Sequence, residues 1–146
     1  MSFINKILSE AFSDEIAKNF NYKRYNRDSD IDFEKLLKHY LPNAIFNSEA
    51  GDETDQALNK RFGKGWHSQF PLDEKLFEKY GKLENINLEK LVYFQPLVVK
   101  QGTMSASKPL QVIATNGKSI LLNGYHRVAE ALIAGITELK ALVITT

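Results

Sequence analysis

Two adjacent titratable side chains, His126 and Arg127, follow directly after Gly124 and Tyr125. The apolar pattern predicts that a strand ends just before Gly124 and that a helix begins at Tyr125. The first N–H groups of a helix lack intrahelical partners, and together with the helix dipole they attract anions. An arginine there can hold phosphate through two parallel hydrogen bonds. The spacing predicts a phosphate pocket; the structural alternative is a tight turn in which His126 faces solvent and Arg127 pairs with a carboxylate.

The second half of the chain supplies the elements that must position this turn. Short apolar segments predict strands, and Asn116-Gly117 predicts a type I′ hairpin because both residues tolerate a positive φ. Strands are expected at residues 86–93, 110–114, 119–122 and 139–144, and a helix at 125–134. This order predicts a small mixed sheet with at least one helix packed on it.

The first half shows three- and four-residue apolar spacing, which is typical of amphipathic helices. Helices are expected at residues 3–12 (continuing or restarting towards 20), from 30 or 32 to 41, at 52–62 and at 73–80. Pro42 ends the second of these, and Gly63 is expected as a left-handed C-cap of the third. We therefore expect an α+β protein, with a helical region over 1–84 packed on a sheet domain over 85–146. Because the second half is too short to bury much surface alone, the two are expected to form one cooperative unit.

Composition excludes several classes of protein. The chain has 146 residues, about one domain, with 19 basic and 18 acidic residues and a net charge of +1. That balance excludes a strongly basic DNA-coating protein but allows a local basic patch. The absence of cysteine excludes disulfides, thiolate zinc sites and a cysteine nucleophile. No apolar run is long enough to span a membrane, and Lys6 and Glu10 interrupt the apolar N-terminal segment, unlike a signal peptide, so we expect a cytoplasmic protein.

Residues 85–146 resemble the ParB/sulfiredoxin superfamily, most specifically over 109–136. That family shows a proline-led strand, a hairpin, a second strand and a glycine-containing basic turn into an alanine-bearing helix. The matching positions here are Gly124, His126, Arg127, Ala131 and Gly135. The segment 86–95 is similar to the family's first strand, and Gln95 matches the glutamine often found after it.

The resemblance implies a nucleotide, such as ATP or CTP, or a nucleic-acid phosphate bound at the turn, usually with a divalent metal such as Mg²⁺. Known activities of the superfamily include CTP hydrolysis, ATP-dependent sulfinic acid reduction, serine phosphorylation and proposed nuclease action. Three positions depart from the family pattern: Asn123, Tyr125 and Glu130. Tyr125 stands where sulfiredoxins have cysteine, so their chemistry is excluded. Asn123 supplies no carboxylate for a metal, and Glu130 replaces an expected alanine.

Further candidates lie at the turn and, in the case of Glu89 and Gln95, near the first predicted strand of the second half. The catalytic candidates are Glu89 (a base or metal ligand), His126 and Arg127, and the phosphate- or nucleotide-binding candidates are Gln95, Asn123, Gly124, Tyr125, His126 and Arg127. Each has a structural alternative: a solvated strand-edge Glu89, a Gln95 that satisfies buried backbone groups, and a Tyr125 that packs on the sheet rather than stacking on a base. The segment 60–67, with its basic residues, Trp66 and His67, is either a second nucleic-acid contact or a solvated connection.

Two classes of function stay open. One is a small nucleotide-binding enzyme of ParB-like type: an NTPase, phosphotransferase, nuclease or other hydrolase. The other is a non-catalytic binding module, in which the sheet domain is a scaffold and the helical half binds a protein partner or DNA. The retained glycine and basic residues of the turn favour the first class, and Asn123 and Glu130 favour the second.

Overall fold

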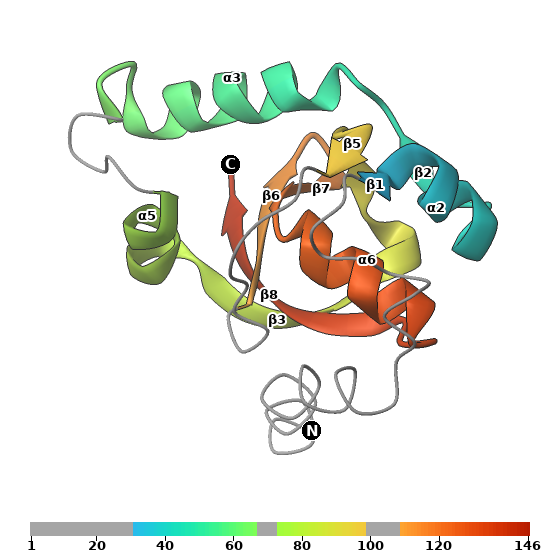
Figure 1. Cartoon of the computed structure of the whole chain (residues 1–146). Coiled ribbons are helices and arrows are strands. Elements are labelled where there is room, and N and C mark those ends of the chain that lie inside the picture. Colours follow the sequence, from blue (N-terminus) through green and yellow to red (C-terminus); the bar gives the residue numbers. More distant parts are fainter. Residues whose placement is uncertain (1–30, 67–72, 99–108) are drawn as a thin grey trace.

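The computed structural model describes residues 31–66, 73–98 and 109–146, which form a mixed β-sheet with helices on both faces (Figure 1). The α+β fold class is therefore confirmed. None of the described helices has both the length and the apolar character needed to cross a membrane. The helix predicted over 3–12, its continuation towards 20, and His67 lie outside the described residues.

The main sheet has six strands in the order β2-β4-β7-β6-β8-β3. Neighbours pair in parallel in β2–β4, β4–β7 and β6–β8, and antiparallel in β6–β7 and β3–β8. The strand bounds are β2 Ile45–Phe46, β3 Lys82–Asn87, β4 Val92–Tyr93, β6 Leu110–Thr115, β7 Lys118–Asn123 and β8 Glu138–Thr145. Two further strands, β1 Ile31–Asp32 and β5 Leu97–Val98, pair with each other.

The predicted hairpin is confirmed at the centre of the sheet. Asn116 and Gly117 join β6 to β7 with φ values of 52° and 75°, the positive pair that a type I′ turn requires. The register places Val112 opposite Leu121 and Ile113 opposite Ile120, all fully or almost fully buried. The hairpin therefore fixes the start of β7 and its register with β6.

Helices cover both faces of the sheet because its central strands are apolar on both sides. Helix α6, Tyr125–Ile133, packs with α2, Phe33–Tyr40, over one face. Helices α3, Ala50–Phe62, and α5, Asp73–Tyr80, share a separate core cluster with Ile113 and Ile144. Asp32 caps α2 by accepting a hydrogen bond from the Lys35 N–H, as the sequence predicted for one of two aspartates.

The strand predicted over 86–93 is wrong, because the chain turns in its middle. Strand β3 ends at Asn87, a 3-10 turn (η1) covers Leu88–Lys90, and β4 follows. Asn87 Oδ1 accepts the Glu89 N–H at 3.0 Å, and the Leu88 N–H donates to the carbonyl of Thr137 at 2.9 Å. The two hydrogen bonds hold the chain in a turn at Leu88, whose side chain is buried, so β3 and β4 cannot form one continuous strand.

Strands also occur in the part of the chain expected to be helical. Strand β2 joins the edge of the main sheet, and β3 begins at Lys82, so the expected boundary after residue 84 lies inside a strand. Because β3 is an edge strand with mostly exposed side chains, its sequence lacks the apolar alternation of a half-buried strand. Gly63 ends α3 at φ 86° and ψ 157°, which is not the left-handed helical conformation expected of it.

Candidate functional site

A left-handed glycine joins β7 to α6 (Figure 1). Gly124 is the N-cap residue of α6, with φ 115° and ψ 19°. The positive φ of Gly124 requires glycine, and a Cβ there would also lie 2.5 Å from Leu110 Cδ2 and displace this buried side chain. The start of α6 is thereby held against the start of β6.

The first turn of α6 presents backbone donors and partial positive charge. The Val128 N–H donates to the Gly124 carbonyl at 3.0 Å, so the N–H groups of Tyr125, His126 and Arg127 precede the intrahelical hydrogen bonds. The first turn contains no acidic residue to offset the positive end of the helix dipole. This end of α6 therefore suits an anion.

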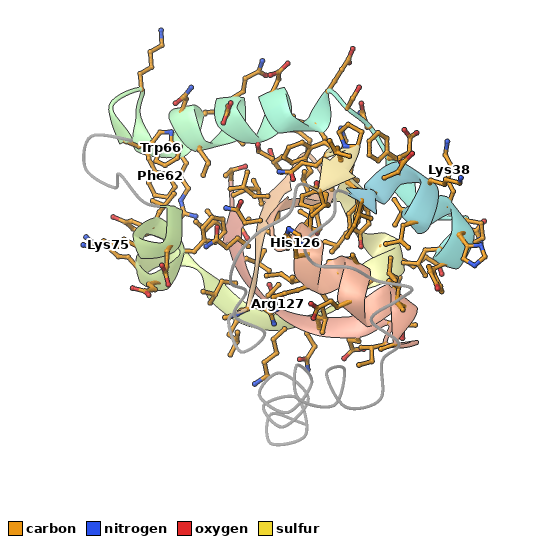
Figure 2. The ribbon with its side chains drawn as sticks, in the orientation of Figure 1. Lys38, Phe62, Trp66, Lys75, His126 and Arg127 are labelled. Carbon is orange, nitrogen blue, oxygen red and sulfur yellow. The ribbon has the colours of Figure 1, made fainter. Side chains whose placement is uncertain are left out.

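Arg127 adds a buried cation at this end of the helix (Figure 2). Its side chain is only 6% exposed, and its Nη1 is buried with no hydrogen-bond partner within the described part of the chain. Burial lowers the pKa of Arg127 to about 10, and the nearby Glu130 carboxylate partly offsets this effect, so the guanidinium stays charged at neutral pH. A buried donor without a partner costs about 1–3 kcal/mol, which a phosphate oxygen could recover.

Glu130 is a buried charged residue near the site that the sequence did not identify as a site residue; it was noted only because the family has alanine at this position. It is 1% exposed, lies three residues after Arg127 on α6, and interacts electrostatically with that guanidinium. The i,i+3 spacing of opposite charges on one predicted helix was the available signal. His126 is also mostly buried, at 9% exposure, so the alternative in which it faces solvent is wrong.

Tyr125 lies in the core rather than at the surface. Its ring is 4% exposed and meets Phe33 edge-on at 4.9 Å between centroids. Its hydroxyl donates to the Leu121 carbonyl and accepts from the Phe94 N–H, both at 2.9 Å. Burial raises the pKa of Tyr125, while backbone hydrogen bonds from Phe94 and Gln95 act in the opposite direction. Tyr125 therefore ties the turn to the segment after β4 and does not offer its ring to a base.

The remaining candidates divide between the two ends of α6. Gln95 is half-buried, and its backbone lies beside the Tyr125 hydroxyl, near the turn. Asn123 is exposed, and its Nδ2 donates to Gln111 Oε1 at 2.6 Å across the β6–β7 pair. Glu89 is exposed in η1, which is bonded to the chain just beyond the C-terminal end of α6. The structure therefore does not bring Glu89 to the turn.

The donor set of the turn does not fit a divalent metal held by the protein. Asn123 offers an amide that is already engaged with Gln111, and the carboxylate of Glu130 is enclosed beside Arg127. Across residues 31–66, 73–98 and 109–146, no three histidine or acidic side chains are placed to hold a metal ion. Mg²⁺ needs oxygen ligands in near-octahedral geometry, and these side chains do not supply them.

An open pocket of about 460 Å³ lies elsewhere, at the start of α3. Its lining residues are Asn47, Glu49, Asp52, Glu53, Gln56 and Lys118. The single cation, Lys118, is paired with Glu53 at 2.6 Å. The excess of carboxylates repels phosphate, so this pocket is not the anion site.

No family model matches the chain, and comparisons with curated proteins and with solved structures likewise give no match. The described fold and turn define the molecule at a coarser level. It is an α+β protein whose mixed sheet leads, through a left-handed glycine, into a buried helix with a cationic N-terminal turn.

Proposed function

We propose that this chain binds the phosphate of a nucleotide or nucleic acid at the β7–α6 turn, as a domain of ParB/sulfiredoxin type. The observation that carries the proposal is the buried, charged Arg127 side chain, whose Nη1 donor has no partner in the described residues. Natural proteins rarely leave such a donor unsatisfied, and its position beside the start of a helix favours an anionic partner.

The turn would hold phosphate through two kinds of donor. The first N–H groups of α6 would donate hydrogen bonds to one phosphate oxygen at the helix end, and Arg127 would bind a second oxygen from the side. Glu130 would stabilise the charged form of the guanidinium while reducing its net attraction for the ligand. The proposal is limited to binding, because the described residues near the turn supply no exposed carboxylate as a base and no set of metal ligands.

The cellular location and the protein partner belong to the same proposal. We place the protein in the cytoplasm, where nucleotides and nucleic acids are found, and we assign a protein partner, if one binds, to the region 1–84. Nucleotide hydrolysis, the enzymatic alternative, is not part of this binding proposal, and the titration below tests for it by following phosphate release in the same samples.

Calorimetric titration of the full chain with ATP, CTP, GTP, inorganic phosphate and a short oligonucleotide, each with and without Mg²⁺, tests the proposal. Arg127→Gln should weaken binding by about 30–150-fold, which corresponds to about 2–3 kcal/mol for a charge-assisted contact. Lys38→Gln removes one charge from an exposed site on α2 and should leave the affinity unchanged.

A second variant covers the case in which Arg127→Gln does not fold, since that change takes a counter-charge from Glu130. Arg127→Lys keeps the charge but loses the bidentate hydrogen bonding of a guanidinium, and should weaken phosphate binding by about tenfold. Wild-type affinity in a folded Arg127→Lys protein would contradict bidentate hydrogen bonding between Arg127 and phosphate. A wild-type protein that binds none of these ligands would contradict the proposed function as a whole.

A further inference from the structure

A cluster of rings and cations lies where the C-terminal ends of α3 and α5 meet. The guanidinium carbon of Arg61 is 4.8 Å from the ring centroid of Phe62 and 5.5 Å from that of Tyr80. The two rings are 4.8 Å apart, and Lys79 Nζ lies 5.4 Å from the Tyr80 ring. The α3–α5 corner is the name used for Arg61, Phe62 and Tyr80 together with the lysines that flank them in the sequence, Lys60, Lys64 and Lys79.

The stacking groups of the corner are both fixed and accessible. Arg61 Nη1 donates to the carbonyl of Thr145 at 2.7 Å, which anchors one edge of the guanidinium to β8. Arg61 itself is exposed, and Tyr80 is 36% exposed although it is aromatic. An anchored guanidinium plane and an exposed ring need little further ordering before a flat ligand stacks on them.

Exposed lysines flank these groups along the chain. Lys60, Lys64, Lys75 and Lys82 are exposed and form no ion pair within the described part of the chain. The sequence of α5 also contains three acidic residues, Asp73, Glu74 and Glu78. Figure 2 shows Phe62, Trp66 and Lys75 together on the side of the molecule opposite Lys38.

Charge is segregated along α3. Its first turns carry Asp52, Glu53 and Asp55, whereas its last turn carries Lys60 and Arg61. An anionic chain is therefore repelled from one end of α3 and attracted to the other.

We infer that the α3–α5 corner binds single-stranded nucleic acid. Unpaired bases would stack on Arg61 and Tyr80, and the lysines would contact the flanking phosphates, which is the combination that single-strand binding surfaces use. This inference goes beyond the proposed function and uses different residues. A base paired in a duplex cannot present its face to the rings, so the corner should prefer single strands.

Fluorescence anisotropy with a labelled dT20 strand, over a series of salt concentrations, tests the inference on the full chain. The double variant Lys60→Gln/Lys64→Gln should raise the Kd by about 5–20-fold and reduce the slope of log K against log salt by about 1.4, for two lost phosphate contacts. Lys35→Gln/Lys38→Gln removes the same charge from exposed positions on α2 and should leave the slope unchanged.

Tyr80→Leu separates stacking from charge. It should weaken dT20 binding by about tenfold without altering the salt slope, because no phosphate contact is lost. A thermal melt by circular dichroism confirms that each variant is folded. The corner variants should also bind mononucleotides like the wild type, so a failure at the corner is distinguishable from a failure at the β7–α6 turn.

Three results would overturn the inference. The first is a wild-type protein that does not bind dT20 at low salt. The second is an equal loss of affinity in the α2 control, which would indicate attraction by net charge alone. The third is tighter binding of a 20-base-pair duplex than of dT20, which would contradict base stacking.

Discussion

Arg127 and Arg61 carry the same guanidinium group in opposite surroundings. Arg127 is 6% exposed, with a counter-charge on its own helix and an Nη1 that lacks a partner in the described residues. Arg61 is exposed, hydrogen-bonded to the carbonyl of Thr145 and stacked on two rings. The buried group is shielded from salt and tied to the packing of the core, whereas the exposed group is hydrated and screened.

This difference in burial predicts how the region around α6 and the α3–α5 corner each respond to amino-acid substitution. Around α6, a substitution alters the stability of the fold and the selectivity of binding together, because the same buried contacts serve both. At the α3–α5 corner, replacing an exposed charged side chain alters affinity and its salt dependence with little effect on stability.

The largest difference in stability loss is expected between a substitution of Gly124, at the β7–α6 turn, and one of Gly63, which follows Phe62 of the α3–α5 corner in the chain. Gly124→Ala adds a Cβ at φ 115° within 2.5 Å of Leu110 Cδ2, whereas Gly63→Ala, at φ 86°, meets nothing within 4 Å. Strain and overpacking should together cost Gly124→Ala about 4 kcal/mol of unfolding free energy, and strain alone should cost Gly63→Ala about 2 kcal/mol. Urea denaturation measures both, and equal losses would contradict the close approach of the turn to β6.

The next effect concerns the counter-charge of Arg127. Glu130→Gln leaves the guanidinium in a buried site without that carboxylate and should cost about 3 kcal/mol of stability. The matched surface change is Glu34→Gln, which removes the exposed partner of Lys38 and should cost less than about 0.5 kcal/mol.

The same Glu130→Gln variant should bind phosphate more tightly than the wild type, because a negative charge near the ligand is removed. Stability and affinity would then change in opposite directions. Denaturation and calorimetric titration of one preparation measure both, and a parallel loss of the two would show that Glu130 only supports the fold.

A smaller effect is expected in alkaline solution. Burial raises the pKa of Tyr93 and of Tyr125, so the stability that these neutral hydroxyls provide is complete below pH 10 and is lost as the pH rises. Burial lowers the pKa of Arg127 to about 10, so rising pH relieves the cost of burying its charge and opposes the loss.

Between pH 10 and pH 12, the two tyrosines lower the unfolding free energy and the one arginine raises it. The net change should be a loss of about 1.4 kcal/mol per pH unit. Arg127→Gln removes the opposing contribution, so its loss should be about 2.7 kcal/mol per pH unit. Denaturation curves at several pH values measure both slopes, and identical slopes would show that the Arg127 guanidinium keeps its proton up to about pH 12.

The smallest effect is expected at the exposed rim of the turn. Asn123→Asp loses the donor that binds Gln111 Oε1 and adds negative charge near the ligand, so phosphate affinity should fall about fivefold, or about 1 kcal/mol. Gln111→Glu adds the same charge but keeps an acceptor for Asn123 Nδ2, and it should give a smaller loss. A gain of Mg²⁺-dependent phosphate release in Asn123→Asp would instead support a weakened enzyme.

Elements that depend on neighbouring residues were predictable from the sequence. The Asn116-Gly117 hairpin requires only two residues that tolerate positive φ, and the end of β7 followed by α6 required only a glycine between two apolar patterns. The strand over 86–93 was not predictable in this way. Its interruption depends on the carbonyl of Thr137, which lies about fifty residues further along the chain.

The order of residues by itself placed a glycine, a histidine and an arginine at the start of a helix, because helix and turn formation depend on dihedral angles and hydrogen bonds within about four residues. Only the tertiary structure decided that Arg127 is buried beside Glu130, that Tyr125 lies in the core, and that Arg61 meets Tyr80. Burial and long-range stacking arise when helices from distant parts of the chain pack on one sheet, and no local pattern specifies which side chains that packing removes from water.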